Sequence, residues 1–190
     1  LESGETVREV CGMTARKIKI NRAPVMTLWA AVVAERLGYD EDASLRLGKA
    51  VAGLNAQSKG RSLGIYSAKQ GSSKEADRGR AESETSPVLL LGRPVPTVRS
   101  KHGLRASIKG EEVESAPVRK YLESKFGEDL ADVRAAMQAL AQAYQPEALN
   151  ERAFALYERF RPAVPKGKQG WGAAGELDLG LLGELARKKQ

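Results

Sequence analysis

The chain has 190 residues, of which 42% are hydrophobic and 29% are charged, and its formal net charge is +7. This composition is typical of a globular protein, and the sequence has no apolar run long enough to span a membrane. One cysteine, Cys11, excludes an intramolecular disulfide, and the first residues lack a signal-peptide pattern, so we expect a cytoplasmic protein. The positive charge suggests nucleic acid as a partner, although the excess is spread thinly along the chain.

The first regular pattern is an alternation of lysine and isoleucine over residues 17–20. A period of two predicts a short strand with one face in water, and a basic arm that reaches along DNA is the alternative interpretation. We interpret the residues before Met13 as an upstream extension of the chain.

Two helices are predicted next, joined by a sharp turn. Apolar residues recur every three and four positions over 25–37, which predicts a helix whose apolar stripe covers about a third of its surface. Gly38 is placed to end this helix in the left-handed conformation, and Asp40 or Asp42 to cap the next one. Gly48 and Gly53 lie inside the second helix, which suggests that another backbone packs very close to it.

This passage resembles the helix-turn-helix of bacterial DNA-binding proteins over residues 30–49. The matching residues are an alanine four positions before the turn glycine and the apolar residues around the turn: Ala34, Gly38, Val33, Leu37, Tyr39 and Leu47. The resemblance implies that the second helix enters the major groove, with these residues pointing outward: Asp42, Ala43, Arg46 and Lys49.

The run AERLGYDEDASLRLG also resembles the opening helix pair of HD-type phosphohydrolases, which bind metal through paired histidine and aspartate. The run that follows, GKAVAGLNAQSKG, contains neither residue, and the one histidine, His102, is far away in sequence. We therefore predict no metal and no cofactor. Since no catalytic signature is found elsewhere, we also expect a protein that is not an enzyme.

Residues 67–86 contain no apolar residue larger than alanine, which predicts a flexible linker, with a solvated helix near 74–82 as the alternative. Residues 87–107 are then expected to form two or three short strands, with Lys101, His102 and Gly103 at a hairpin tip. Such a hairpin resembles the wing of winged-helix proteins. That resemblance implies that Arg99, Lys101 and Arg105 approach a DNA backbone.

The C-terminal part is predicted to be helical. Its apolar periodicity gives one helix ending at Gly127, a second over 130–141 and a third from Pro146 to Phe160, which together form a small bundle. A final helix is expected near 178–188, after a loop over 166–180 that contains Trp171. We expect Trp171 to fill a gap in the core, with a stacking surface for a base or ligand as the alternative.

Together these patterns predict an α+β, mainly α fold with a helix-turn-helix-like pair, a β-hairpin region and a C-terminal helical bundle. The expected regions are 16–66, the linker 67–86, and 87–190, which can pack with 16–66 as one domain. The predicted function is non-catalytic binding of DNA, or of RNA, as in a transcriptional regulator, and a homodimer would cover two half-sites. The alternative is a protein-interaction or assembly module. The predicted nucleic-acid-binding residues are Lys17, Lys19, Arg46, Lys49, Lys59, Arg61 and Lys101.

Overall fold

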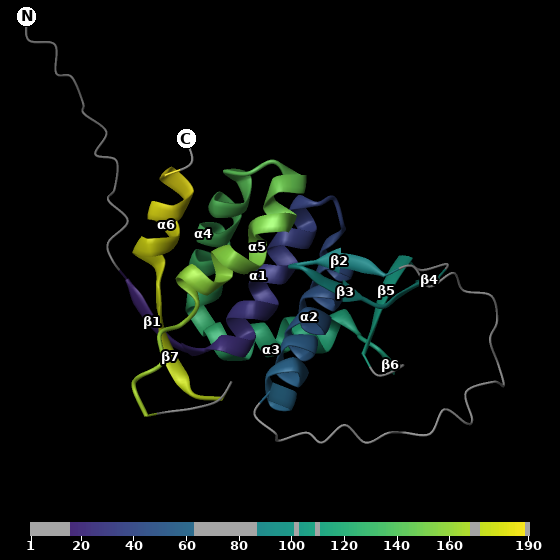
Figure 1. Cartoon of the computed structure of the whole chain (residues 1–190), viewed down its shortest axis with the longest axis horizontal. Coiled ribbons are helices and arrows are strands. Elements are labelled where there is room, and N and C mark those ends of the chain that lie inside the picture. The colour runs from purple at the N-terminus through teal and green to yellow at the C-terminus, as the bar shows by residue number, and fades with distance from the viewer. Residues whose placement is uncertain (1–15, 63–86, 101–102, 109–110, 168–171, 189–190) are drawn as a thin grey trace, which may run out of the picture.

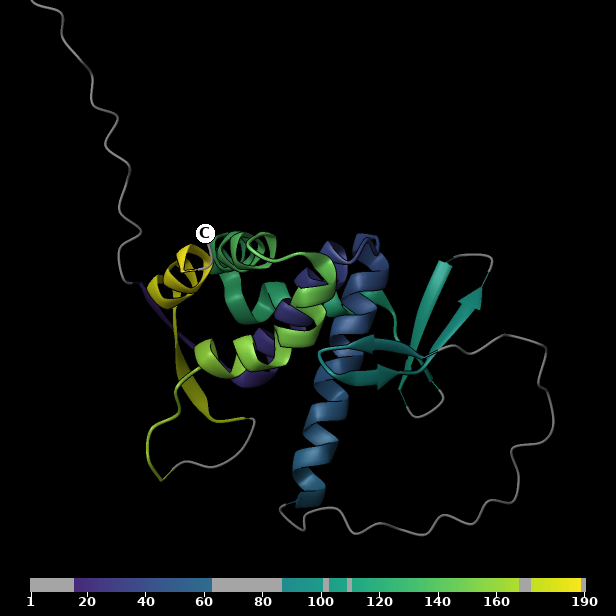
Figure 2. The same ribbon diagram turned by 45° about the horizontal axis from the view of Figure 1, so that its top comes forward.

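The computed structural model describes residues 16–62, 87–100, 103–108, 111–167 and 172–188, and it confirms the predicted mainly helical α+β class. The helices are α1 (Arg22–Arg36), α2 (Glu41–Ser62), α3 (Ser115–Phe126), α4 (Leu130–Gln142), α5 (Pro146–Phe160) and α6 (Leu179–Arg187). The strands are β1 (Lys17–Asn21), β2 (Val88–Leu90), β3 (Arg93–Val95), β4 (Thr97–Ser100), β5 (Gly103–Ile108), β6 (Glu111–Glu112) and β7 (Ala174–Asp178). Figures 1 and 2 show the helices as a central body, with β1 and β7 on one side and β2 to β6 on the other. The predicted linker 67–86 lies outside the described residues.

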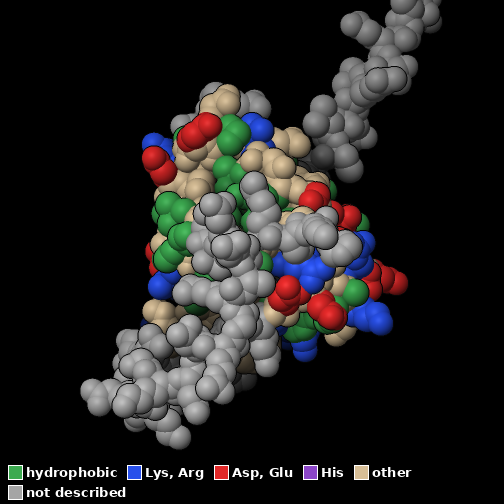
Figure 3. Space-filling model, turned by 90° about the vertical axis from the view of Figure 1, so that its right-hand side faces the viewer, with side chains coloured by type: hydrophobic (Ala, Val, Ile, Leu, Met, Phe, Trp, Pro, Cys, Tyr) green, Lys and Arg blue, Asp and Glu red, His purple; other side chains and the backbone are tan. Residues whose placement is uncertain are grey.

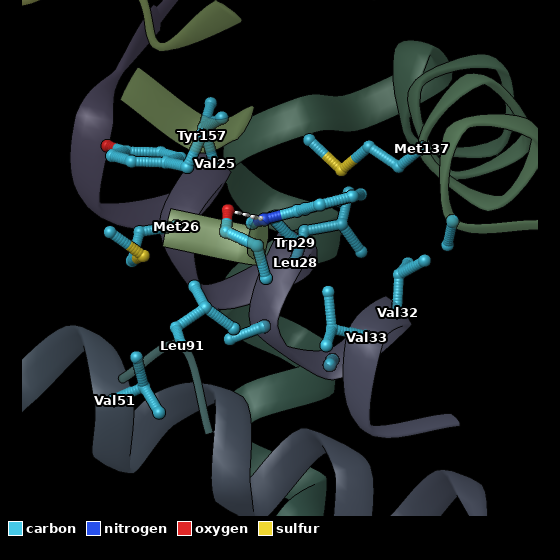
Figure 4. Close-up of a cluster of buried hydrophobic side chains, with 14 of the residues drawn as sticks. Val25, Met26, Leu28, Trp29, Val32, Val33, Val51, Leu91, Met137 and Tyr157 are labelled. Atoms are coloured by element: carbon cyan, nitrogen blue, oxygen red, sulfur yellow. Dashed lines mark hydrogen bonds between the residues drawn. The ribbon is translucent and has the colours of Figure 1, made fainter. Parts of the chain in front are cut away.

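Helix α1 lies at the centre of this body. Its residues from Pro24 to Ala34 are all buried, so the expected stripe covering a third of the helix was too narrow. The reason is that alanines occupy much of the rest of the helix surface and allow α2, α4 and α5 to pack around it. Trp29 anchors this packing and lies within the cluster of buried side chains in Figure 4. Its Nε1 donates to the Ala153 carbonyl at 2.8 Å, and its ring meets that of Phe160 edge-on, with 5.2 Å between the ring centroids.

The turn between α1 and α2 is formed by the residues that the sequence indicated, Gly38 and Asp40. Gly38 has a φ of +101°, which confirms the predicted left-handed end, and the Asp40 carboxylate accepts a hydrogen bond from the Ala43 N–H at 2.8 Å. The predicted close backbone contact is found at Gly48. A Cβ atom there would collide with the Thr27 carbonyl and lie 3.1 Å from the Ala31 nitrogen, so glycine permits α2 to lie directly on α1.

Residues 88–112 form more strands than the two or three expected. Strands β2 and β3 pair through a two-residue turn in which Leu91 and Gly92 both have positive φ, 51° and 70°. Leu91 adopts this unusual conformation with its side chain only 1% exposed, so core burial offsets the backbone strain. The predicted hairpin is confirmed as β4 and β5, extended by β6 and packed against α2, but Lys101 and His102 at its tip lie outside the described residues.

Strand β1 confirms the strand interpretation of residues 17–20, and its partner was not predicted. It pairs in antiparallel fashion with β7, from Lys17 opposite Asp178 to Asn21 opposite Ala174. The loop expected over 166–180 was therefore wrong from residue 174 onward. Ala163 adds a bridge to Glu176 on the other edge of β7. Trp171 lies outside the described residues.

The C-terminal helices begin and end close to the predicted positions. α3 ends before Gly127, whose φ is +55°, and α5 begins at Pro146. Their buried residues join those of β1, α1, α2, β2, β3, β5, β7 and α6 in one hydrophobic cluster. The described parts of 16–66 and 87–190 therefore share a core.

Candidate nucleic-acid interface

The face of α2 that the helix-turn-helix resemblance directs outward lies against α3. Asp42 is exposed and lies 3.6 Å from the Arg119 guanidinium of α3, while the Lys49 ammonium lies 4.6 Å from the centre of the Tyr121 ring. Arg46 is half-buried, and its Nε has no hydrogen-bond partner among the described residues. Ala43 is only 4% exposed, so the expectation that it points outward was wrong.

Burial continues along α2 beyond this face. Every side chain from Ala43 to Gln57 is buried or half-buried, because α1 and α3 cover the helix together with β3 and β5. Lys59 and Arg61 follow in the last turns of α2, but their side chains lie outside the described part of the structure. Among the described residues, the most exposed cations therefore lie on elements other than α2.

The β4–β5 hairpin offers charges of both signs. Arg105 forms an ion pair with Glu112 of β6, and the side chain of Arg99 lies outside the described part of the structure, as does Lys101. Figure 3 views the molecule from this side. Lysine and arginine side chains lie next to aspartate and glutamate side chains over the part of the surface that is not grey. The visible surface on this side does not present a large patch of one sign.

Strand β1 presents two lysines on one face. Ile18 and Ile20 point into the core, at 8% and 4% exposed, so Lys17 and Lys19 both point to solvent. The Lys17 ammonium lies 3.6 Å from the Glu176 carboxylate of β7. Lys19 lies directly opposite Glu176 in the strand register but makes no ion pair with any described residue.

Two arginines come together beside the end of β1. The Arg22 Nε donates to the Pro162 carbonyl at 3.1 Å, and the Tyr157 hydroxyl donates to the Arg22 carbonyl at 3.3 Å. Burial raises the pKa of Tyr157, and the nearby charges of Arg22 and Arg161 partly oppose this increase. The Arg22 side chain therefore binds the residue that directly follows Arg161 in the chain.

We use the name β1 cationic face for the four cations of this region: Lys17, Lys19, Arg22 and Arg161. They come from β1, the start of α1 and the residue after α5, and two carboxylates share the surroundings, those of Glu176 and Asp178. Asp178 also caps α6 by accepting from the Leu181 N–H at 3.2 Å. Of these four cations, Arg161 was not predicted as a binding residue. Its proximity to β1 depends on the pairing of β7 with both β1 and Ala163, which no local sequence pattern indicates, whereas Arg22 directly follows β1 in the chain.

Comparison of the chain with protein-family models, with curated proteins and with solved structures gave no match. Within the described residues, no group of three or more histidine, cysteine, aspartate or glutamate side chains is arranged to hold a metal ion. No helix in the described part of the chain is long and apolar enough to cross a membrane.

Proposed function

We propose that this protein binds nucleic acid, DNA in the first place, through the β1 cationic face. The observation that carries the proposal is that the fold brings Arg161 beside Lys19 and Arg22, which lie about 140 positions earlier in the chain. Ala163 bridges Glu176, which lies opposite Lys19, and the Arg22 side chain donates to the Pro162 carbonyl. None of the three cations forms an ion pair with another described residue. Cations of this kind can neutralise phosphates, and the release of condensed counterions then drives binding.

The geometry of the face suits contact with a phosphate backbone. Lys17 and Lys19 are two residues apart on one side of a strand, so their Cα atoms lie about 7 Å apart, which is close to the spacing of successive phosphates along one strand. The β1–β7 pairing and the bridge to Ala163 fix the strands that carry them. Backbone contacts of this type position a protein on nucleic acid and carry little sequence information.

Helix α2 is less suited to the role that the helix-turn-helix resemblance implies. A recognition helix inserts its first turns into the major groove. In this structure the first turns of α2 meet α3, through the Arg119 contact to Asp42 and the Tyr121 contact to Lys49. We therefore place the nucleic acid at the β1 cationic face, with Arg46 and Lys49 outside the interface.

A salt titration tests this proposal. We expect the protein to bind a labelled random DNA duplex with a micromolar Kd that weakens steeply as salt is raised. In a Lys19→Ala/Arg161→Ala variant, the slope of log K against log salt should fall by roughly 1.8, because each lost phosphate contact removes about 0.9. Fluorescence anisotropy provides the measurement.

The matched control is Lys120→Ala/Lys125→Ala, which removes two exposed cations from α3. This variant has the same net charge as the test variant but keeps the β1 cationic face. We expect it to retain the wild-type slope within error. Equal losses in both variants, or no binding at low salt, would rule out the β1 cationic face as the interface.

A further inference from the structure

A groove runs between α4 and α6, and one of its ends lies next to the start of β1, where Arg16 and Leu179 line it. Figures 1 and 2 both show α6 lying beside α4. The groove has a volume of about 680 Å³, and small residues of both helices form most of its walls: Ala135, Ala136, Ala139, Ala143, Gly183 and Ala186. Since these side chains are short, another helix could approach the two backbones closely.

The outer wall of the groove carries a regular seam on α4. Asp132, Ala135, Ala139 and Gln142 are all exposed, and their spacings of three, four and three residues are those of the inward positions of a coiled coil. A seam with this spacing matches a second helix at a shallow crossing angle. Its two ends are polar and its middle is alanine, so it favours a partner helix with the same pattern.

The charges at the two ends of the groove are complementary. Asp132 lies at the end of the groove where α4 and α6 both begin. Arg16 joins the two helix starts there, because its side chain donates to Asp132 at 2.8 Å and its carbonyl accepts from the Leu179 N–H at 3.0 Å. Arg187 lies at the opposite end, beside Gln142 and Ala143, and makes no ion pair with any described residue. Asp132 remains 61% exposed and has a second oxygen available.

From these features we infer that the groove holds α4 of a second copy of this chain, in antiparallel orientation about a two-fold axis. In this arrangement Ala135 and Ala139 of one copy meet Ala139 and Ala135 of the other, at the axis. Asp132 then lies at the far end of the second copy's groove, opposite the Arg187 guanidinium and the Gln142 amide of that copy. The same pairs form twice, as an isologous interface requires.

Sedimentation velocity of the full chain, from about 1 to about 200 µM, tests this dimer without any nucleic acid. We expect a monomer–dimer equilibrium in which the dimer has twice the chain mass. Ala139→Glu should raise the dissociation constant at least about tenfold, because it places two carboxylates at the axis. Ala155→Glu, at an exposed alanine of α5, is the matched control and should leave the equilibrium unchanged.

A charge exchange provides the second test, at two exposed positions. Arg187→Asp alone should weaken the dimer, and adding Asp132→Lys to the same chain should restore part of the affinity, because the exchanged pair again joins opposite charges. Wild-type protein that stays monomeric at the highest concentration would overturn the inference. A dimer that neither Ala139→Glu nor Arg187→Asp weakens would overturn it as well.

Discussion

At the residue scale, Tyr157 links the core to the β1 cationic face. Its ring meets that of Phe160 edge-on, with 5.8 Å between the ring centroids. Its side chain lies among the buried residues of α1 and α5 (Figure 4). Its hydroxyl reaches the start of α1 through the Arg22 carbonyl. The phenol therefore helps to fix the position of Arg22 relative to the residues that follow α5.

Tyr157 should make the free energy of unfolding depend on pH in alkaline solution. Its pKa is raised above the ordinary value of 10.0, mainly by burial. Below that value both the folded and the unfolded chain keep the phenol proton, so Tyr157 adds no pH dependence. Above it the unfolded chain loses the proton first, and stability falls as pH rises, by up to about 1.4 kcal/mol per pH unit.

Urea denaturation of wild type and Tyr157→Phe at several pH values above 9 would measure this effect. The stability of the variant should fall less steeply with pH than that of wild type, because the variant has no phenol at position 157 to titrate. Parallel slopes for wild type and Tyr157→Phe would show that the phenol titrates normally.

At the element scale, β7 holds the two sides of the β1 cationic face together. It pairs with β1 on one edge and with Ala163 on the other, so it sets the position of the chain after α5 relative to Lys17 and Lys19. Gly175 allows this close approach. A Cβ atom at that position would lie 2.8 Å from the Ala163 carbonyl oxygen and 2.9 Å from the Pro162 Cβ.

Gly175→Val should therefore destabilise the fold by about 1–3 kcal/mol, as expected for overpacking against backbone. Ala174→Val tests the same substituent at the exposed neighbouring position of β7, and its effect should stay within about 0.5 kcal/mol. Chemical denaturation compares the two variants. If Gly175→Val proves as stable as Ala174→Val, the segment after α5 is not packed against β7 in the manner described.

At the scale of the whole molecule, local sequence patterns predicted the helices well but did not predict the pairing of strands that lie far apart in the chain. Gly38, Asp40, Gly127 and Pro146 marked helix ends because caps and turns depend on a few neighbouring residues. Strand β7 was missed because its five residues, with Gly175 in a buried position, carry weak strand propensity. It is stabilised by β1, whose residues lie more than 150 positions earlier in the chain.

The candidate interface was predictable only in part for the same reason. Lys17 and Lys19 could be identified from their alternation with isoleucine, which fixes their exposed face. The covered face of α2 could not be foreseen from the sequence. Apolar periodicity shows which side of a helix is buried most, and it does not show that α3 lies against Asp42 and Lys49. Arg161 joins the site only through the tertiary fold.

The most direct test of DNA binding by the β1 cationic face is a titration of isotope-labelled protein with a short DNA duplex, followed by amide chemical shifts. We predict that the largest shift changes fall on β1, the first turn of α1 and the residues just after α5, around Lys19, Arg22 and Arg161. Changes centred on α2 or on the β4–β5 hairpin, or no changes at low salt, would show that the β1 cationic face is not the interface.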